Sequence, residues 1–162
     1  MPSTTRSSRR AAAAVEPRGA SAWVVRASFA LSLIGLGVAA YLTYAHFTSV
    51  NALVCSDNGA VNCAKVTTSS QSEIFGVLPV AVIGLAYFVG MVALCSPWSW
   101  RPIRLLDQLR LAGVVSGVGM VFYLVYAELF QIDAVCIYCT AVHVVTVLLF
   151  IVVMSDSLTR PR

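Results

Sequence analysis

Charged residues are scarce in this sequence of 162 residues. Asp, Glu, Lys and Arg together make up 11%, whereas soluble domains carry about a quarter. The hydrophobic fraction is 59% and the mean hydropathy is +0.83. This composition argues against a soluble globular domain and indicates an integral membrane protein. The chain has room for one small helical bundle, so we expect no second domain.

Motifs for soluble redox cofactors are also missing. No G-x-G-x-x-G occurs in a strand-to-helix context, which makes a nicotinamide or flavin cofactor less attractive. Only two histidines are present, so little supports a metal site built on imidazole. Any redox chemistry must therefore come from other groups, and the chain contains five cysteines.

Four apolar runs, each close to or above the roughly 20 residues that cross a hydrocarbon core, predict four membrane helices. We expect these helices over residues 23–47, 74–94, 111–130 and 134–154. The expected fold class is an all-α membrane protein, a four-transmembrane-helix bundle with an extracytoplasmic loop between helices 1 and 2. We divide the chain into a disordered basic cytoplasmic tail (1–21), a membrane domain (22–155) and a short cytoplasmic tail (156–162).

Local signals support the second and third helices. Ser70 and Glu73 stand at capping-box spacing just before the second run, and Pro79 lies in the expected first turns. Residues 96–110, rich in Trp and Arg, are predicted to form a short interfacial connection. Small residues in the third run would let another helix approach closely: Gly113, Ser116, Gly117 and Gly119.

The basic residues predict the orientation. Of the eleven Lys and Arg, only Lys65 lies in a loop opposite the termini. By the positive-inside rule, both termini and the 96–110 connection are expected in the cytoplasm of a multi-pass plasma-membrane protein. Because topology explains the arginines, the net charge of +4 is no argument for nucleic-acid binding. The acids expected to face outward are Asp57, Glu73, Glu128 and Asp133.

Four of the five cysteines then lie at the outer edge of the membrane, in or facing the compartment where disulfides persist. These are Cys55, Cys63, Cys136 and Cys139. Cys95, at the cytoplasmic end of the second helix, is expected to be a packing residue. The outer location makes two redox-active pairs the leading interpretation.

Cys136 and Cys139 form a C-x-x-C motif at the head of the fourth helix. Such a pair is typical of a redox centre, although cysteine in an apolar context also serves in packing or as a metal ligand. With Asp133 as N-cap, Cys136 would occupy the third helical position, where the helix dipole and unpaired amides favour a thiolate. The Asp133 carboxylate partly opposes this effect.

Cys55 and Cys63 are separated by seven residues in a loop that contains Gly and Asn. They can close a disulfide and still move, whereas the C-x-x-C pair is held by its helix. A mobile pair beside a fixed pair suggests electron relay by thiol–disulfide exchange. Because the fixed pair adjoins lipid, a lipid-soluble quinone in a mostly apolar pocket is the natural two-electron acceptor.

The cysteine order resembles that of the vitamin K epoxide reductase family, in particular its bacterial members. The shared pattern is Cys55-x7-Cys63, Ser69, Ile74-Phe75-Gly76 and Cys136-Ile-Tyr-Cys139. The resemblance spans residues 23–154. In the other bacterial membrane disulfide generators, which also have four helices, the C-x-x-C lies in the first outer loop, so the late position here favours this family.

The resemblance implies roles for the cysteines and for a quinone pocket. Cys63 would exchange with Cys136, Cys139 would lie against the quinone, and Cys55 would meet the redox partner. Three further residues would bind the quinone: Ser69 near the ring, with Phe75 and Leu78 lining the pocket. For Ser69 the alternative is an ordinary loop hydroxyl, and for the other two a place in the core.

Two positions depart from the animal members, which carry Asn and Tyr where this chain has Ser72 and His143. His143 lies one turn beyond Cys139 on the same helix face. It is suited either to hydrogen-bond a quinone carbonyl or to pack against its neighbours. Recognition of a vitamin K epoxide or of anticoagulants is therefore not carried over.

The implied activity is that of a membrane thiol–disulfide oxidoreductase. Many bacterial relatives resemble this core fused to a thioredoxin-like domain, whereas only a short tail follows Met154 here. We therefore expect a separate extracytoplasmic thioredoxin-fold partner. The protein would reoxidise that partner and pass the electrons to menaquinone or ubiquinone, which supports disulfide formation in exported proteins.

Two alternatives stay open. Reduction of vitamin K epoxide or quinone, as in animal members, uses the same flow of electrons from thiols, so the cysteines do not distinguish it. The other alternative is a different class of protein, a membrane protein that binds or takes up a soft metal ion through the four outer cysteines. The Cys55-x7-Cys63 spacing is loose for a metal site, so no metal ligand is predicted.

Overall fold

The computed structural model describes residues 20–48, 55, 61–67, 69, 73–74, 78–101 and 103–159. The elements are α2 (Ala22–Thr48), α3 (Cys63–Thr67), β1 (Glu73–Ile74), β2 (Leu78–Pro79), α4 (Val80–Cys95), the 3-10 helix η3 (Pro97–Ser99), α5 (Arg104–Ala127), the π-helix η4 (Glu128–Ile132) and α6 (Ile137–Thr159). The described chain is mainly helical, as predicted. The expected basic tail lies outside the described residues.

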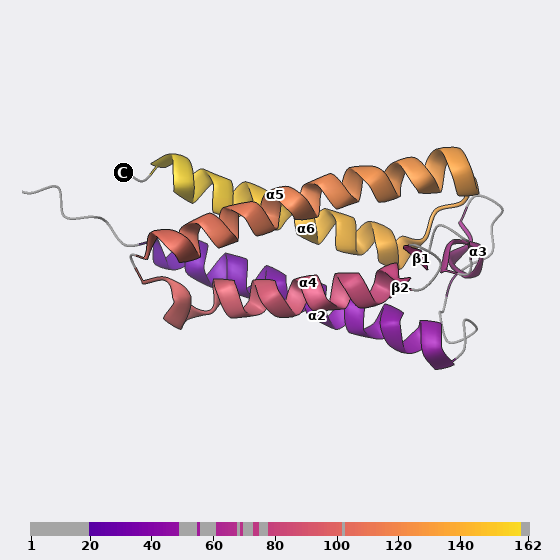
Figure 1. Cartoon of the computed structure of the whole chain (residues 1–162), viewed down its shortest axis with the longest axis horizontal. Helices are drawn as coiled ribbons and strands as arrows, with labels where there is room; N and C mark the ends of the chain where they lie inside the picture. Colours follow the sequence, from indigo (N-terminus) through magenta and orange to yellow (C-terminus); the bar gives the residue numbers. More distant parts are fainter. Residues whose placement is uncertain are drawn as a thin grey trace, which may run out of the picture.

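Four long helices form an antiparallel bundle. α2 and α5 each pack against both α4 and α6, so the helices close a ring (Figure 1). α2 begins and α6 ends at the same end of the bundle, while α3, β1 and β2 gather at the other end (Figure 1). The two segments that carry the predicted redox cysteines therefore meet at one end of the molecule.

Three segments are long and apolar enough to cross a membrane: α2, α5 together with η4, and α6. α4 is equally apolar but has 16 residues, fewer than the roughly 20 that span a hydrocarbon core. These helices suit a multi-pass membrane protein. The fourth crossing, over α4, stays a prediction.

The second helix starts later than predicted. Instead of a helix from residue 74, Glu73 and Ile74 pair antiparallel with Leu78 and Pro79, and α4 begins at Val80. The proline explains the boundary, because its ring disfavours helical backbone at the preceding residue. Pro79 itself has φ −59° and ψ 130° and ends the hairpin rather than joining the helix.

The third helix starts earlier than predicted, at Arg104, so the expected interfacial connection is partly helical. Arg110 is only 2% exposed. Its guanidinium donates two hydrogen bonds to the Leu94 carbonyl at the end of α4, at 3.2 and 3.0 Å. It also pairs with Asp107 at 2.7 Å and lies 3.8 Å above the Trp100 ring. These partners satisfy a helix-end carbonyl and allow the charge to be buried.

Small residues let the helices approach closely, as predicted for the third helix. A Cβ at Gly113 or Gly117 would overlap side chains of α4. The other two small residues predicted for this face do not make a close helix contact, because Ser116 is exposed and Gly119 has open space beside it. Cys95 is fully buried in a core cluster, in agreement with the predicted packing role.

Candidate active site

The site begins with a disulfide at the end of the bundle where α3 lies. Cys55 and Cys63 are joined, with Cα atoms 6.0 Å apart. Cys63 is the first residue of α3 and is 1% exposed, whereas Cys55 is half-buried. The disulfide that the loop spacing allowed is therefore present, and Cys55 is the more exposed of its two residues.

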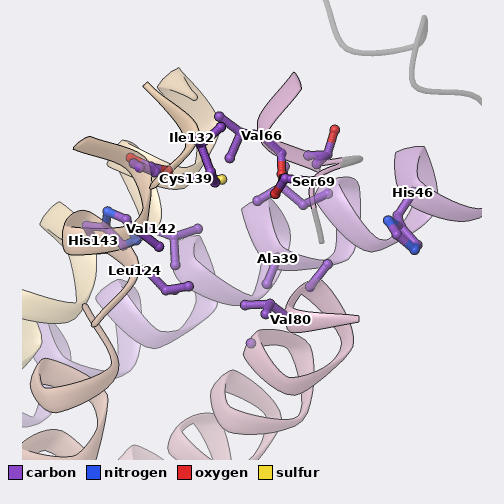
Figure 2. A pocket seen from close by; sticks show the side chains of 16 residues that line it. Ala39, His46, Val66, Ser69, Val80, Leu124, Ile132, Cys139, Val142 and His143 are labelled. Atoms are coloured by element: carbon purple, nitrogen blue, oxygen red, sulfur yellow. The ribbon is translucent and has the colours of Figure 1, made fainter. Parts of the chain in front are cut away.

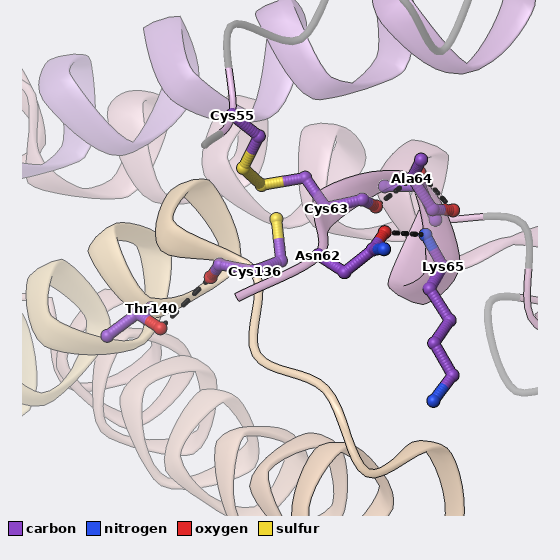
Figure 3. The surroundings of a disulfide bond; sticks show 8 residues. Cys55, Asn62, Cys63, Ala64, Lys65, Cys136 and Thr140 are labelled. Carbon is purple, nitrogen blue, oxygen red and sulfur yellow. Dashed lines mark hydrogen bonds between the residues drawn. A yellow bond between two sulfur atoms is a disulfide. The ribbon is translucent and has the colours of Figure 1, made fainter. Parts of the chain in front are cut away.

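A short backbone bridge holds this disulfide against the C-x-x-C segment. Val61 pairs in parallel with Val135, and the Asn62 N–H donates to the Val135 carbonyl at 3.2 Å. Cys63 and Cys136 follow these residues directly and belong to the same core cluster. Figure 3 shows the Cys136 sulfur pointing toward the disulfide. The bridge thus brings together the two cysteines that the family resemblance pairs.

The start of the last helix corrects one expectation. Asp133 does not cap α6, because it has a left-handed φ of 51° and ends η4. α6 begins at Ile137, so Cys136 immediately precedes it. The Cys136 carbonyl accepts hydrogen bonds from Thr140, from the N–H at 2.9 Å and from the hydroxyl at 3.0 Å. Cys136 therefore stands at the N-cap position, not at the third helical position.

This position still favours a Cys136 thiolate. A hydrogen bond with the Cys139 side chain, together with the backbone amides of Cys139 and Tyr138, lowers the pKa of the Cys136 thiol to about 7, although burial acts in the opposite direction. Cys136 and Cys139 are both free thiols. A thiolate, the reactive form in disulfide exchange, is therefore available near neutral pH.

A cavity lies beside Cys139 and is bounded by all four long helices (Figure 2). Its empty volume is about 810 Å³, which includes space open to the surroundings. The lining residues are mostly apolar: Ala39, Leu42, His46, Val66, Thr67, Ser69, Val80, Ala81, Gly84, Leu124, Ala127, Glu128, Ile132, Cys139, Val142 and His143.

Three of the residues predicted for the site meet in this cavity: Cys139, Ser69 and His143. His143 is 7% exposed, and the Ser69 hydroxyl donates to the Val66 carbonyl at 2.8 Å. Phe75 lies outside the described residues. Only the backbone of Leu78, in β2, is described.

Sequence reasoning missed two ionisable residues of the cavity, Glu128 and His46. Glu128 is 6% exposed, and its carboxyl group interacts electrostatically with the Cys139 thiol, which lines the same cavity. The available signal was an acid inside an apolar run, since ionisable residues within membrane segments are candidates for function. The charge distribution predicts only that Glu128 faces outward. Its approach to Cys139 depends on the fold.

A model of the vitamin K epoxide reductase family matches residues 26–154, which is most of the chain. The chain therefore belongs to the vitamin K epoxide reductase family, as its cysteine order and motifs indicated. Membership implies a membrane oxidoreductase that works through thiols and disulfides. Within the described part of the chain, no group of three or more His, Cys, Asp or Glu side chains is placed to hold a metal ion.

Proposed function

We propose that this member of the family reoxidises an extracytoplasmic thioredoxin-fold protein and passes the electrons to a membrane quinone, menaquinone or ubiquinone. One observation carries the proposal. The Cys55–Cys63 disulfide and the free C-x-x-C thiols share one cluster, and Cys139 lines an adjoining apolar cavity. This arrangement has an entry point for electrons at the half-buried Cys55 and an exit at Cys139.

The relay needs two thiol–disulfide exchanges. After the partner has reduced the loop pair, the Cys63 thiolate attacks Cys136 of a Cys136–Cys139 disulfide and releases Cys139. Cys55 then attacks Cys63 and releases Cys136 as a thiolate. Because a sulfur of low pKa leaves faster, the lowered pKa of Cys136 favours this second step. The products are a Cys55–Cys63 disulfide and a reduced C-x-x-C.

The cavity residues fit a quinone by their chemistry. A bound quinone accepts two electrons and two protons. The apolar lining would hold the ring and exclude water. The His143 ring, and the Ser69 hydroxyl once it turns from the Val66 carbonyl, would orient the carbonyl groups of the quinone. Cys139 would face the ring, and Cys136 would re-form the disulfide with Cys139 as the electrons leave. Phe75 and Leu78 are proposed to complete the lining.

We further infer the orientation from the distribution of basic residues. Arg26 lies near the start of α2, Arg101 lies before α5, and Arg104 is its first residue. All three belong to the end of the bundle opposite the Cys55–Cys63 disulfide. By the positive-inside rule that end faces the cytoplasm. The disulfide would then face the oxidising side, within reach of a secreted partner.

The test uses the full chain purified in detergent, a reduced thioredoxin-fold protein and a menaquinone or ubiquinone analogue. Loss of partner thiols and formation of quinol are followed together. We expect partner oxidation only with quinone present, and its loss in Cys139→Ala. Cys95→Ala is the matched control, because Cys95 lies in the core away from the cavity.

Two outcomes would overturn the proposal: partner oxidation at the same rate without quinone, or quinol formation by Cys139→Ala at the wild-type rate. Reduction of a vitamin K epoxide draws on the same electron path, so the epoxide is offered as a second acceptor. Turnover of the epoxide in place of the quinone would transfer the assignment to the animal-type reaction.

A further inference from the structure

Glu128 is a buried carboxyl group beside the reacting thiols, and the relay described above gives it no role. It is 6% exposed and lines the cavity together with Cys139. Its carboxyl group is close enough to the Cys139 and Cys136 thiols to interact with both of them electrostatically. A carboxyl group is costly to bury in a membrane bundle, so its presence at this position calls for a reason.

The backbone around Glu128 is specialised as well. Glu128 opens the π-helix η4, a type of turn that is frequent at functional sites. The N–H groups of Asp133 and Ala134 both donate to the Glu128 carbonyl, the latter at 3.2 Å. The left-handed Asp133 then turns the chain toward Cys136. One short segment thus holds both the carboxyl group and the approach to the C-x-x-C motif.

Reduction of a quinone requires proton transfer inside this cavity. As the Cys136–Cys139 bond forms, the two thiols lose two electrons and two protons. The quinone gains the electron pair in its ring and one proton on each oxygen. The cavity wall is mostly apolar, so the proton that leaves Cys139 needs a carrier within hydrogen-bond reach.

We propose that Glu128 is a catalytic residue that takes the proton of the Cys139 thiol and delivers it to a quinone oxygen. The carboxyl group ends in its starting state. The proton of Cys136 exchanges with water at the outer end of the bundle, from which the second quinone oxygen is protonated. This inference rests on the proposed function and adds to it the proton path of the same site.

Among the residues that the structure describes, few other titratable groups line the cavity around this carboxyl group or adjoin it. Cys136, Cys139 and His143 come from α6 and its N-cap, and His46 comes from the end of α2. The two histidines also line the cavity and are the competing proton carriers. A His143→Gln variant separates their contribution from that of Glu128.

The kinetic test is a single turnover of fully reduced protein mixed with quinone. General acid–base catalysis typically contributes 10²–10⁴-fold, so we expect Glu128→Gln to slow quinol formation by about a hundredfold or more. Glu128→Asp keeps a carboxyl group and should recover part of the rate. Asp133→Asn is the matched control, because Asp133 is exposed, does not line the cavity, and asparagine tolerates its left-handed backbone.

A second readout needs no quinone. When the C-x-x-C pair is oxidised, Cys139 can no longer donate to Glu128, so the carboxyl stretching band should shift in the infrared difference spectrum between reduced and oxidised protein. We expect this band to be lost in Glu128→Gln and kept in Asp133→Asn. An unchanged spectrum in Glu128→Gln would show that Glu128 does not sense Cys139, and would overturn the inference.

The two proposals fail in different ways. If the wild-type protein reduces quinone and Glu128→Gln does so at the same rate, Glu128 is not the proton carrier and the proposed function stands. A wild-type protein that reduces no quinone would remove both. Exchange between Cys63 and Cys136 should proceed normally in Glu128→Gln, and this result would show that the variant is folded. If Glu128→Gln does not fold, Glu128→Asp tests the same role.

Discussion

At the scale of single residues, Cys136 combines full burial with a thiol that ionises near neutral pH. Burial alone would suppress the thiolate. The hydrogen bond with Cys139 and the amides of Cys139 and Tyr138 outweigh burial. The N-cap position explains why these amides are available, because the first N–H groups of a helix have no intrahelical partner.

This local chemistry predicts a pH dependence. A thiol is unreactive below its pKa. The rate of the reverse exchange, in which Cys136 attacks the Cys55–Cys63 disulfide, should therefore fall about tenfold per pH unit below a midpoint of about 7 and level off above it. Rapid acid quenching, alkylation and mass spectrometry of the thiols would measure it. In Cys139→Ala the midpoint should move to higher pH, since the hydrogen bond with Cys139 is the largest cause of the lowered pKa. A midpoint that stays in place would contradict this assignment.

At the scale of elements, the packing of α2 on α4 depends on a glycine. A Cβ at Gly35 would overlap the ring of Phe88, and Phe88 is 1% exposed and enclosed by neighbouring side chains. Close helix approach at small residues is a usual feature of membrane bundles. This contact joins two of the four helices that border the cavity.

Substitution of this glycine should therefore destabilise the bundle. We expect Gly35→Ala to cost roughly 1–3 kcal/mol, the usual range for overpacking a core, because the ring has little room to move. Thermal unfolding in detergent would measure the loss. Gly37→Ala is the matched control on the same helix, where a Cβ has no neighbour within 4 Å. Equal melting temperatures for the two variants would show that the Phe88 ring can move away from a Cβ at residue 35 without loss of stability.

At the scale of the whole molecule, the described arginines and the Cys55–Cys63 disulfide lie at opposite ends of the bundle. Arg26, Arg101 and Arg104 belong to the end where α2 begins and α6 ends, and the disulfide belongs to the other (Figure 1). In the orientation proposed from the positive-inside rule, the thiols would lie outside and the arginines inside. In that orientation the half-buried Cys55 would face the compartment of its proposed partner.

Labelling in intact cells tests this orientation. After mild reduction, a membrane-impermeant thiol reagent should modify Cys55 from the outside. A reporter cysteine in the variant Thr159→Cys, at the exposed end of α6, should react only after the membrane is opened. The reverse pattern would invert the topology and place the disulfide in a reducing compartment.

The sequence alone determined what depends on composition and local order. The apolar runs predicted a helical membrane bundle, and the first predicted helix, over residues 23–47, agrees closely with α2 (Ala22–Thr48). The spacing of Cys55 and Cys63 allowed the disulfide that is present, and the order of the cysteines indicated the family. Apolar runs and short cysteine spacings can be read directly from a sequence, because each depends only on residues that are near one another along the chain.

Only the tertiary structure decided what depends on contacts between distant segments. The Val61–Val135 bridge places Cys63 against Cys136, and the ends of four helices form the cavity around Cys139. Glu128 became a site residue only when η4 brought it to that thiol. No periodicity or spacing encodes these encounters, because they arise when separate apolar segments pack together and bury a few polar groups that must then find partners.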